Sequence, residues 1–266
     1  MKFLIGVDLE GVACAYAPCG ESIEKSFNIE FVRKQATREA DAAARALFDM
    51  GATEVVVWDN HGRGCSLDYD NLDERCLIAI GSDGKTRYPV LDDSFAGVLL
   101  IGYHAKASEG EAVIAHTFSS KDYQWVKING EEFGEIGIDA AIAGNKGVPV
   151  IFVSGDDKTI KETNEFLPWA KTTETKKSLA FTRTISKHPK AVVKEIYENV
   201  KLAVKDIDKM QCFTVNEPVM AEIRYRRADL ALNSRLVDMN GDNFKYDGSY
   251  TRSGMLKTVE DVVFRL

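Results

Sequence analysis

The stretch Lys2-Phe3-Leu4-Ile5-Gly6-Val7-Asp8 decides the class of fold of this 266-residue chain. Its short apolar run ends in an acid, which is typical of a buried strand. Glu30–Met50 is rich in alanine and stops before Gly51, as a helix with a glycine just past its end does. Thr53–Trp58 (TEVVVW) is a β-branched strand. Strand, helix and strand within about sixty residues predict a βαβ unit and a parallel sheet.

The same alternation continues along the first part of the chain. Gly97–Gly102 and Val148–Val153 are apolar runs that predict strands, and Glu111–His116 is a shorter apolar stretch that we interpret in the same way. Glu135–Asn145 is expected to be helical despite its two glycines. We therefore predict an α/β fold for residues 1–165, with a mostly parallel sheet and flanking helices.

The composition of the sequence changes after Pro168, where a polar segment begins. His188–Met210 repeats apolar residues at helical spacing, and Pro218–Arg226 alternates like a strand. Gly254–Leu266 is expected to form a helix, alone or with a short strand. Residues 166–266 are thus predicted to form a smaller α+β part.

Composition excludes some classes of function. The formal net charge is -7, which argues against binding to a phosphate backbone as the main task. The chain's start is too short in apolar residues for a signal peptide, and no apolar run reaches the ~18 residues that span a bilayer. The five cysteines are an odd number without paired CxxC spacing, which favours a reducing, cytoplasmic setting. We interpret Cys14 and Cys19 as ordinary thiols rather than metal or redox groups.

Carboxylates and imidazoles gather where the predicted strands end, and three of the four histidines in the chain are among them. In open parallel sheets, binding sites form outside the carboxyl ends of the strands. The residues expected there are Asp8 and Glu10 after the first strand, Asp59 and His61 after the second, His104 after the third, and His116 after a fourth segment.

This ligand mixture suits zinc and neighbouring transition metals. Asp8 and Glu10 are two residues apart, so both side chains point to one side of an extended strand, where a cation would offset their repulsion. The set is large enough for two metals that share a carboxylate. Each residue alone also has a structural reading: a helix cap for an aspartate, a hydrogen bond for a histidine. His188, before Pro189, is expected to have no catalytic role, and Asp156-Asp157 chiefly to cap a helix.

With these residues in view, the sequence resembles the DppA-type D-aminopeptidases over nearly its whole length. Six motifs occur in the family's order: Gly6-Val7-Asp8-Leu9-Glu10-Gly11, Asp59-Asn60-His61, Gly102-Tyr103-His104-Ala105, Ala115-His116, Gly134-Glu135-Ile136-Gly137 and Ser154-Gly155-Asp156-Asp157. Two features depart from the family pattern. Gly6 stands where the family has serine, which removes a hydroxyl near Asp8, and the loop Gly11–Asn28 differs, which leaves preference for D-amino acids open.

The resemblance implies two zinc ions per subunit and a role for each ligand. It implies that Asp8 bridges the zincs, that Glu10 and His61 complete one side, and that His104 and Glu135 complete the other. It further implies that His116 is the catalytic residue. Short peptides or aminoacyl amides, including D-amino acid substrates, would be hydrolysed inside a barrel-like homo-oligomer of ten subunits, with no nucleic acid or membrane partner.

Other functions remain open at this point. In a haloacid-dehalogenase-type phosphatase, Asp8 would be the nucleophile and Asp156-Asp157 would bind magnesium, but Glu10 fits that pattern poorly and the histidines would be unexplained. A non-catalytic scaffold would leave clustered acids without a cation, which destabilises a fold. An amidohydrolase that acts on a non-peptide amide would use the same metal site.

Overall fold

The βαβ unit predicted at the start of the chain is present in the computed structural model, which describes residues 1–18, 20–62 and 64–266. It consists of β1 (Lys2–Val7), α1 (Ile29–Asp49) and β2 (Glu54–Asp59). The two strands pair in parallel, with Leu4 opposite Val56, and nearly all their side chains are buried. Burial on both faces is what a parallel strand covered by helices requires.

The unit lies inside a seven-stranded sheet of order β3-β2-β1-β4-β7-β8-β9. The further strands are β3 (Leu77–Ala79), β4 (Phe95–Tyr103), β7 (Val150–Asp156), β8 (Lys171–Ala180) and β9 (Arg183–Ser186). Every neighbouring pair is parallel except β8 and β9, which are antiparallel. The prediction of an α/β fold with a mostly parallel sheet is confirmed.

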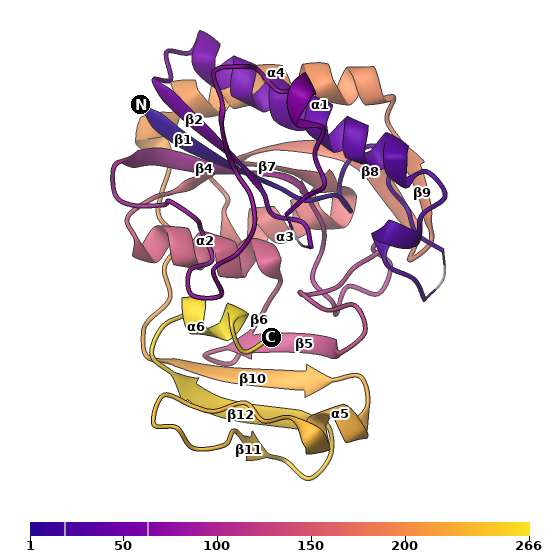
Figure 1. The fold of residues 1–266 in the computed structure, drawn as a ribbon, viewed down its shortest axis with the longest axis vertical. Helices are drawn as coiled ribbons and strands as arrows, with labels where there is room; N and C mark the ends of the chain where they lie inside the picture. The colour runs from indigo at the N-terminus through magenta and orange to yellow at the C-terminus, as the bar shows by residue number, and fades with distance from the viewer. Residues whose placement is uncertain (19, 63) are drawn as a thin grey trace.

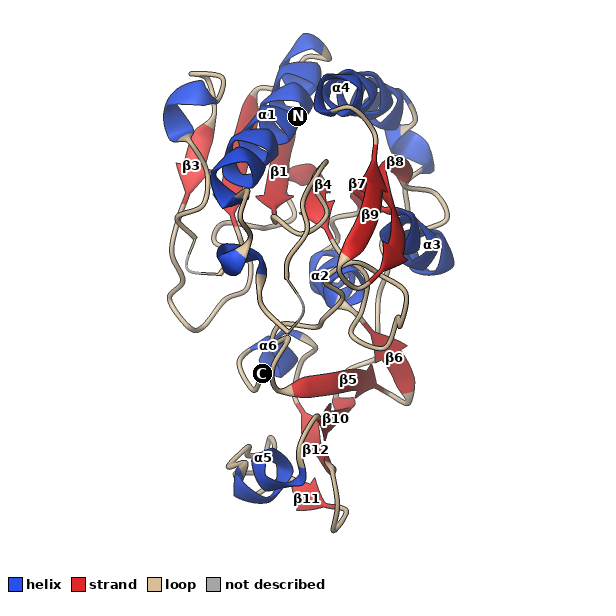
Figure 2. Cartoon of the chain, turned by 90° about the vertical axis from the view of Figure 1, so that its right-hand side faces the viewer, coloured by secondary structure: helices blue, strands red, loops and turns tan. Residues whose placement is uncertain are grey.

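Helices cover both faces of this sheet (Figure 1). α1 and α4 (Pro189–Lys205) lie together on one face, while α2 (Glu135–Asn145) and α3 (Asp157–Phe166) lie on the other (Figure 2). The sheet-facing side of α4 consists of residues spaced three or four apart, all buried: Val192, Ile196, Val200, Ala203 and Val204. Burying each large apolar side chain contributes about 1.5–3 kcal/mol, so the stripe fixes the helix on the sheet.

A five-stranded antiparallel sheet of order β11-β12-β10-β5-β6 forms the other end of the molecule (Figure 1). Its strands are β5 (Tyr123–Ile128), β6 (Glu131–Phe133), β10 (Val219–Tyr225), β11 (Lys245–Tyr246) and β12 (Thr251–Leu256). Two short helices accompany it, α5 (Ala228–Asn233) and α6 (Glu260–Val263), and one-turn 3-10 helices span Ile23–Lys25, Tyr69–Asn71 and Ile207–Lys209.

Both sheets draw strands from both sides of residue 165. β8 and β9 follow that residue but belong to the seven-stranded sheet, whereas β5 and β6 precede it but belong to the five-stranded one. Strand order does not test whether separate folding units exist, so the division into 1–165 and 166–266 stays a prediction.

One local prediction was wrong. Residues 111–116 form turns and loop rather than a strand, because their apolar side chains pack in a loop beside the sheet. The polar segment after Pro168 contains β8, which has no apolar run in its sequence. It forms a strand because it pairs with β7. Gly254–Leu266 contains the end of β12 followed by α6. Among the described residues, no helix has the length and apolarity to cross a bilayer.

Candidate metal centre

The loops after β1 and β4 are pressed together at the carboxyl edge of the sheet. The Asp8 amide donates to the Ile101 carbonyl at 2.8 Å, and the Gly11 amide donates to the Gly102 carbonyl at 2.7 Å. A side chain at Gly11 would place its Cβ 1.8 Å from the Tyr103 carbonyl oxygen, and Gly102 has a φ of +71°. Only glycine allows this approach, which brings the ligands of the two loops within reach of one another.

Asp8 faces two imidazoles with its two carboxylate oxygens. Oδ1 is 2.8 Å from Nδ1 of His61, and Oδ2 is 3.5 Å from Nε2 of His104. Glu10 lies on the first side, with Oε2 3.3 Å from the same His61 nitrogen. Glu135 lies on the second side, with Oε1 3.3 Å from His104 Nε2. The structure therefore brings together all five predicted metal ligands, with Asp8 in the middle.

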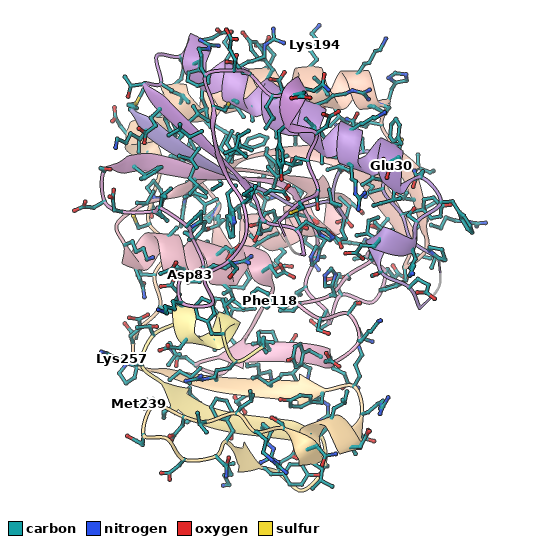
Figure 3. All side chains as sticks on the ribbon, viewed as in Figure 1. Glu30, Asp83, Phe118, Lys194, Met239 and Lys257 are labelled. Atoms are coloured by element: carbon teal, nitrogen blue, oxygen red, sulfur yellow. The ribbon has the colours of Figure 1, made fainter. Side chains whose placement is uncertain are left out.

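Glu135 is held in place by the start of α2, which it opens. A carboxylate is favoured in the first turn of a helix because the free amide groups there point toward it. Its Oε1 also accepts a hydrogen bond from the Phe118 amide at 2.7 Å. Phe118 lies at the junction between the two sheets (Figure 3).

The backbone fixes how His104 and His116 present their rings. Nδ1 of His104 donates to the Ala105 carbonyl at 3.0 Å, and Nδ1 of His116 donates to the Ile114 carbonyl at 2.9 Å. The other nitrogen, Nε2, is left to face Glu135 in both residues, at 3.3 and 3.9 Å. The rings stack with centroids 3.9 Å apart. A ring that donates from Nδ1 to a carbonyl offers the Nε2 lone pair to a metal or a proton.

His116 reaches the site from a strained loop rather than from a strand end, which corrects the prediction from the sequence. Ile114 and Phe118, two residues to either side, have φ values of 57° and 58°. Left-handed backbone costs about 1–3 kcal/mol at such residues and persists where the surroundings enforce it. Hydrogen bonds from the Ile114 amide to the Phe181 carbonyl and from the Ala107 amide to Thr117 Oγ1 hold the loop.

Opposite charges dominate the electrostatics of the cluster. Burial alone would raise the pKa of Glu135, but the His104 imidazole outweighs it and holds that pKa at about 2. Burial opposes protonation of His104, but Glu135 and Asp8 raise the His104 pKa to about 10. The pKa of Glu10 is lowered despite burial, chiefly by His61. Without a metal, protons on the imidazoles offset the carboxylates, and a cation that binds here displaces them.

Two donor atoms of the cluster lack a hydrogen-bond partner in the described part of the chain. Glu10 Oε2 and His104 Nε2 are buried and have no hydrogen-bond partner among the described residues. Buried polar atoms in that state normally have an unseen partner such as water or an ion. Two sets of ligand atoms, each within 4.8 Å of one another, are Asp8, Glu10 and His104, and His104, His116 and Glu135. Imidazole and carboxylate are the donors that zinc takes.

The loop that carries Glu10 is supported from behind. Lys176 of β8 is 1% exposed, and its Nζ donates to three backbone carbonyls, those of Glu10, Val12 and Ala15. Glu39 of α1, also buried, accepts from the Ala13 amide at 3.0 Å. The amino group of Lys176 and the carboxyl group of Glu39, from two distant elements, thus fix the backbone of one ligand loop.

Sequence reasoning missed a second network, which supports Glu135. Asp139 lies one helical turn after Glu135 and forms a bidentate pair with Arg87, at 2.8 and 2.9 Å. Asp139 also accepts from the Tyr103 hydroxyl at 2.7 Å. Arg87 Nη2 is 4.0 Å from Glu135 Oε2. The sequence signal that could have revealed this network is the spacing of Glu135 and Asp139, which are four residues apart and therefore share one face of the helix.

Gly6, where the family pattern has serine, packs under Tyr103. A Cβ at position 6 would lie 3.2 Å from the Tyr103 hydroxyl and 3.4 Å from the Trp58 ring. That Tyr103 hydroxyl accepts from Asn60 Nδ2 at 2.9 Å as well as donating to Asp139. The tyrosine hydroxyl therefore lies where a side chain at position 6 would extend.

Several polar residues singled out in the sequence have other roles. Asp59 turns to the next loop, where Oδ2 accepts from the Ser66 and Leu67 amides, so its expected place in the site was wrong. Asp156 caps α3 by accepting from the Lys158 and Thr159 amides, as predicted. His188 caps α4 in the same way.

Of the two cysteines singled out in the sequence, Cys14 is partly buried, and its amide donates to Ser186 Oγ at 2.8 Å. Cys19 lies outside the described residues.

A cavity of about 230 Å³ opens onto the cluster. Four carboxylates and two imidazoles line it together with Arg87: Asp8, Glu10, Glu24, Glu135, His61 and His116. Glu24 was not predicted as a site residue; its Oε1 is 2.8 Å from Nε2 of His61.

Comparison with known proteins agrees with this geometry. Residues 1–260 match the family Peptidase_M55, described as D-aminopeptidase. A D-aminopeptidase of Bacillus subtilis (strain 168) is 31% identical over 230 residues, which cover 83% of this chain and 80% of that protein. A solved structure, the Zn-dependent D-aminopeptidase DppA from Bacillus subtilis, a self-compartmentalizing protease, superimposes with a TM-score of 0.89 at 28% identity. The superposition covers 99% of this chain and 96% of that one.

These matches confirm the family resemblance, the fold class and the prediction of a metal-dependent aminopeptidase, and they do not favour the phosphatase. The match extends over nearly the whole chain and includes every segment that supplies a ligand to the cluster. The chain belongs to the M55 family of D-aminopeptidases.

Proposed function

We propose that this chain is a zinc-dependent aminopeptidase that hydrolyses short peptides or aminoacyl amides, including those with a D-amino acid at the amino end, at a site for two zinc ions. The observation that carries the proposal is the position of Asp8 between two ligand groups. One of its oxygens is 2.8 Å from His61 and the other is 3.5 Å from His104. A carboxylate with a separate imidazole at each oxygen suits a bridge between two cations.

The ligands divide on either side of Asp8. Glu10 and His61 would hold one zinc ion, and His104 and Glu135 would hold the other. When bound, two such ions supply a water of lowered pKa as nucleophile and polarise the carbonyl that it attacks. The carbonyls of Ala105 and Ile114, which accept from Nδ1 of His104 and His116, fix the ring orientations before any ligand binds.

His116 would be the catalytic residue. It lines the cavity, and its Nε2 is 3.9 Å from the nearest Glu135 oxygen. The two histidines predicted as ligands lie closer to a carboxylate, His61 at 2.8 Å and His104 at 3.3 Å. A proton held at Nε2 could stabilise the oxygen that becomes negative in the tetrahedral intermediate, or pass to the departing amine. The strained loop around it would keep that nitrogen aimed into the cavity.

The shape of the cavity supports small substrates. At about 230 Å³ it lies below the usual range of about 300–1,000 Å³ for drug-sized ligands. A short peptide or an aminoacyl amide fits a cavity of this size.

Two variants test the assignment. His104→Ala should lose bound zinc and turnover together, whereas His116→Ala should retain zinc and lose turnover. His188→Asn is the matched control, because asparagine preserves the cap of α4 and His188 is not among the residues that line the cavity. Metal content is measured by elemental analysis, and turnover with paired D- and L-aminoacyl amides. A His116→Ala protein that turned over these amides normally would remove His116 from the mechanism.

Assembly and location complete the proposal. We infer a homo-oligomer, of ten subunits by resemblance to the family, which light scattering would detect as ten times the 29.5 kDa of one chain. A cytoplasmic location is inferred from the odd number of cysteines without paired spacing. A monomer at working concentrations would refute the assembly without affecting the chemistry of the cluster.

A further inference from the structure

Both nitrogens of His61 face carboxylates. Nδ1 is 2.8 Å from Asp8 Oδ1 and 3.3 Å from Glu10 Oε2, while Nε2 is 2.8 Å from Glu24 Oε1. An imidazole that binds a cation gives the lone pair of one nitrogen to it, and the other nitrogen then carries a proton. Nδ1 faces the ligand cluster, so the proton belongs on Nε2, where Glu24 is the acceptor.

Glu24 is placed by structure rather than by chance at the surface. It lies in the 3-10 helix Ile23–Lys25, whose Ile23 is fully buried, and the amides of Lys25 and Ser26 donate to the Ser22 and Ile23 carbonyls. The end of this loop is tied down by Asn28, whose Nδ2 donates to the Cys14 carbonyl at 3.0 Å. The side chain of Glu24 is 45% exposed at the rim of the cavity, whereas that of His61 is 11% exposed.

We propose that Glu24 is a positioning residue for His61: it fixes the tautomer and the orientation of the ring, and it strengthens binding of a cation on the side of Asp8 and Glu10. Carboxylates that accept from a metal-binding histidine raise the basicity of the ligand, and their loss typically costs 10–100-fold in metal affinity or activity. The inference rests on the proposed function, because it requires that His61 bind zinc. It gives a role to the loop Gly11–Asn28, which departs from the family pattern.

The competing role for Glu24 is recognition of substrate, because a carboxylate at the rim could bind the ammonium group of an amino terminus. The two roles predict different measurements. A positioning residue acts on the metal whether or not substrate is present. A residue that binds substrate changes KM and leaves the metal affinity alone.

The test measures zinc affinity of metal-free protein by competition with a chromophoric chelator. Glu24→Ala should weaken binding at one of the two zinc sites, the one on the side of His61, by about 10–100-fold. Glu24→Gln should fall between wild type and alanine, because its side-chain oxygen still accepts from Nε2 but carries no charge. Glu21→Ala is the matched control, an exposed glutamate in the same loop, and should bind zinc as wild type does. Equal melting temperatures of the metal-free proteins would show that the fold is unchanged.

The outcomes distinguish a failure of the positioning role of Glu24 from a failure of the proposed zinc-dependent function. Wild-type zinc affinity in Glu24→Ala, with or without a raised KM, would overturn the positioning role and leave the proposed function intact. A wild-type protein that bound no zinc would overturn the proposed function and this inference together. A loss of affinity in Glu24→Ala that Glu24→Gln partly restores would support the role.

Discussion

Glu39 provides the sharpest test of how the ligand loop is held, because its ionisation opposes folding. The residue is fully buried in α1; its Oε1 accepts from the Ala13 amide and from Gln35 Nε2, and its Oε2 has no partner among the described residues. Burial raises the pKa of Glu39 from 4.5 to about 7, although these hydrogen bonds and the charge of Lys176 partly oppose the rise.

The sign of the pH dependence follows from which state holds the proton. The folded state keeps the Glu39 proton to about pH 7, whereas the unfolded chain releases it near 4.5. The free energy of unfolding therefore loses a contribution as pH rises between those values and does not regain it above them. At about 1.4 kcal/mol per pH unit, the loss is about 3 kcal/mol.

The variant Glu39→Gln cannot ionise and should lack this loss. Its amide group brings a buried donor without a partner, which costs about 1–3 kcal/mol at every pH, so the difference between the proteins must be followed as a function of pH. We expect Glu39→Gln to gain about 3 kcal/mol relative to wild type between pH 4.5 and 8.

Urea unfolding at several pH values, with fixed protein and zinc concentrations, measures this difference, and the shared pH dependence of zinc binding cancels. Glu30→Gln, in the exposed first turn of the same helix, is the control and should show no such trend. A difference between Glu39→Gln and wild type that stayed constant with pH would refute the reasoning.

Three further predictions concern the site. Gly102→Ala should lower both stability and zinc content, since its Cβ would lie 2.4 Å from the Asp8 carbonyl oxygen; Gly147→Ala, at a φ of +82° with no described atom within 4 Å, should cost only about 1–2 kcal/mol in urea unfolding. Arg87→Met should destabilise by about 3–5 kcal/mol, because it leaves Asp139 as an unpaired buried charge; Arg183→Met, at an exposed arginine, is the charge-matched control. Removal of zinc with a chelator should abolish turnover and reduce stability by about 3 kcal/mol relative to protein at a hundredfold excess over Kd; full turnover after exhaustive chelation would contradict the proposed chemistry.

The part of the site on β1, β2 and β4 could be predicted from the sequence because the end of an apolar run marks the end of a buried strand. Asp8, Glu10, His61 and His104 directly follow such runs, and parallel strands bring their carboxyl ends to one edge. Glu135 was identified only through family resemblance, since a glutamate at the head of a helix looks like any favourable first-turn residue.

What the sequence did not reveal depends on contacts between distant segments. Glu24 meets His61 across 37 positions, and no periodicity encodes that approach. β8 reads as a polar tract, yet Lys176 is buried because three carbonyls from another loop surround its ammonium group. Asp59 is the last residue of β2, close in the fold to where His104 follows β4, but its Oδ2 accepts hydrogen bonds from the amides of Ser66 and Leu67.

Because both sheets contain strands from distant parts of the chain, the order of synthesis determines when each sheet can be completed. β5 and β6 leave the ribosome well before β10, the strand that pairs with β5 and joins the hairpin to the rest of its sheet. Glu135 comes two residues after β6, so we expect the position of its backbone to depend on that hairpin. A nascent chain that stops short of residue 219 would carry all five ligands but an unfinished support for one of them. Hydrolytic competence should therefore arise only after β10 has emerged and paired with β5.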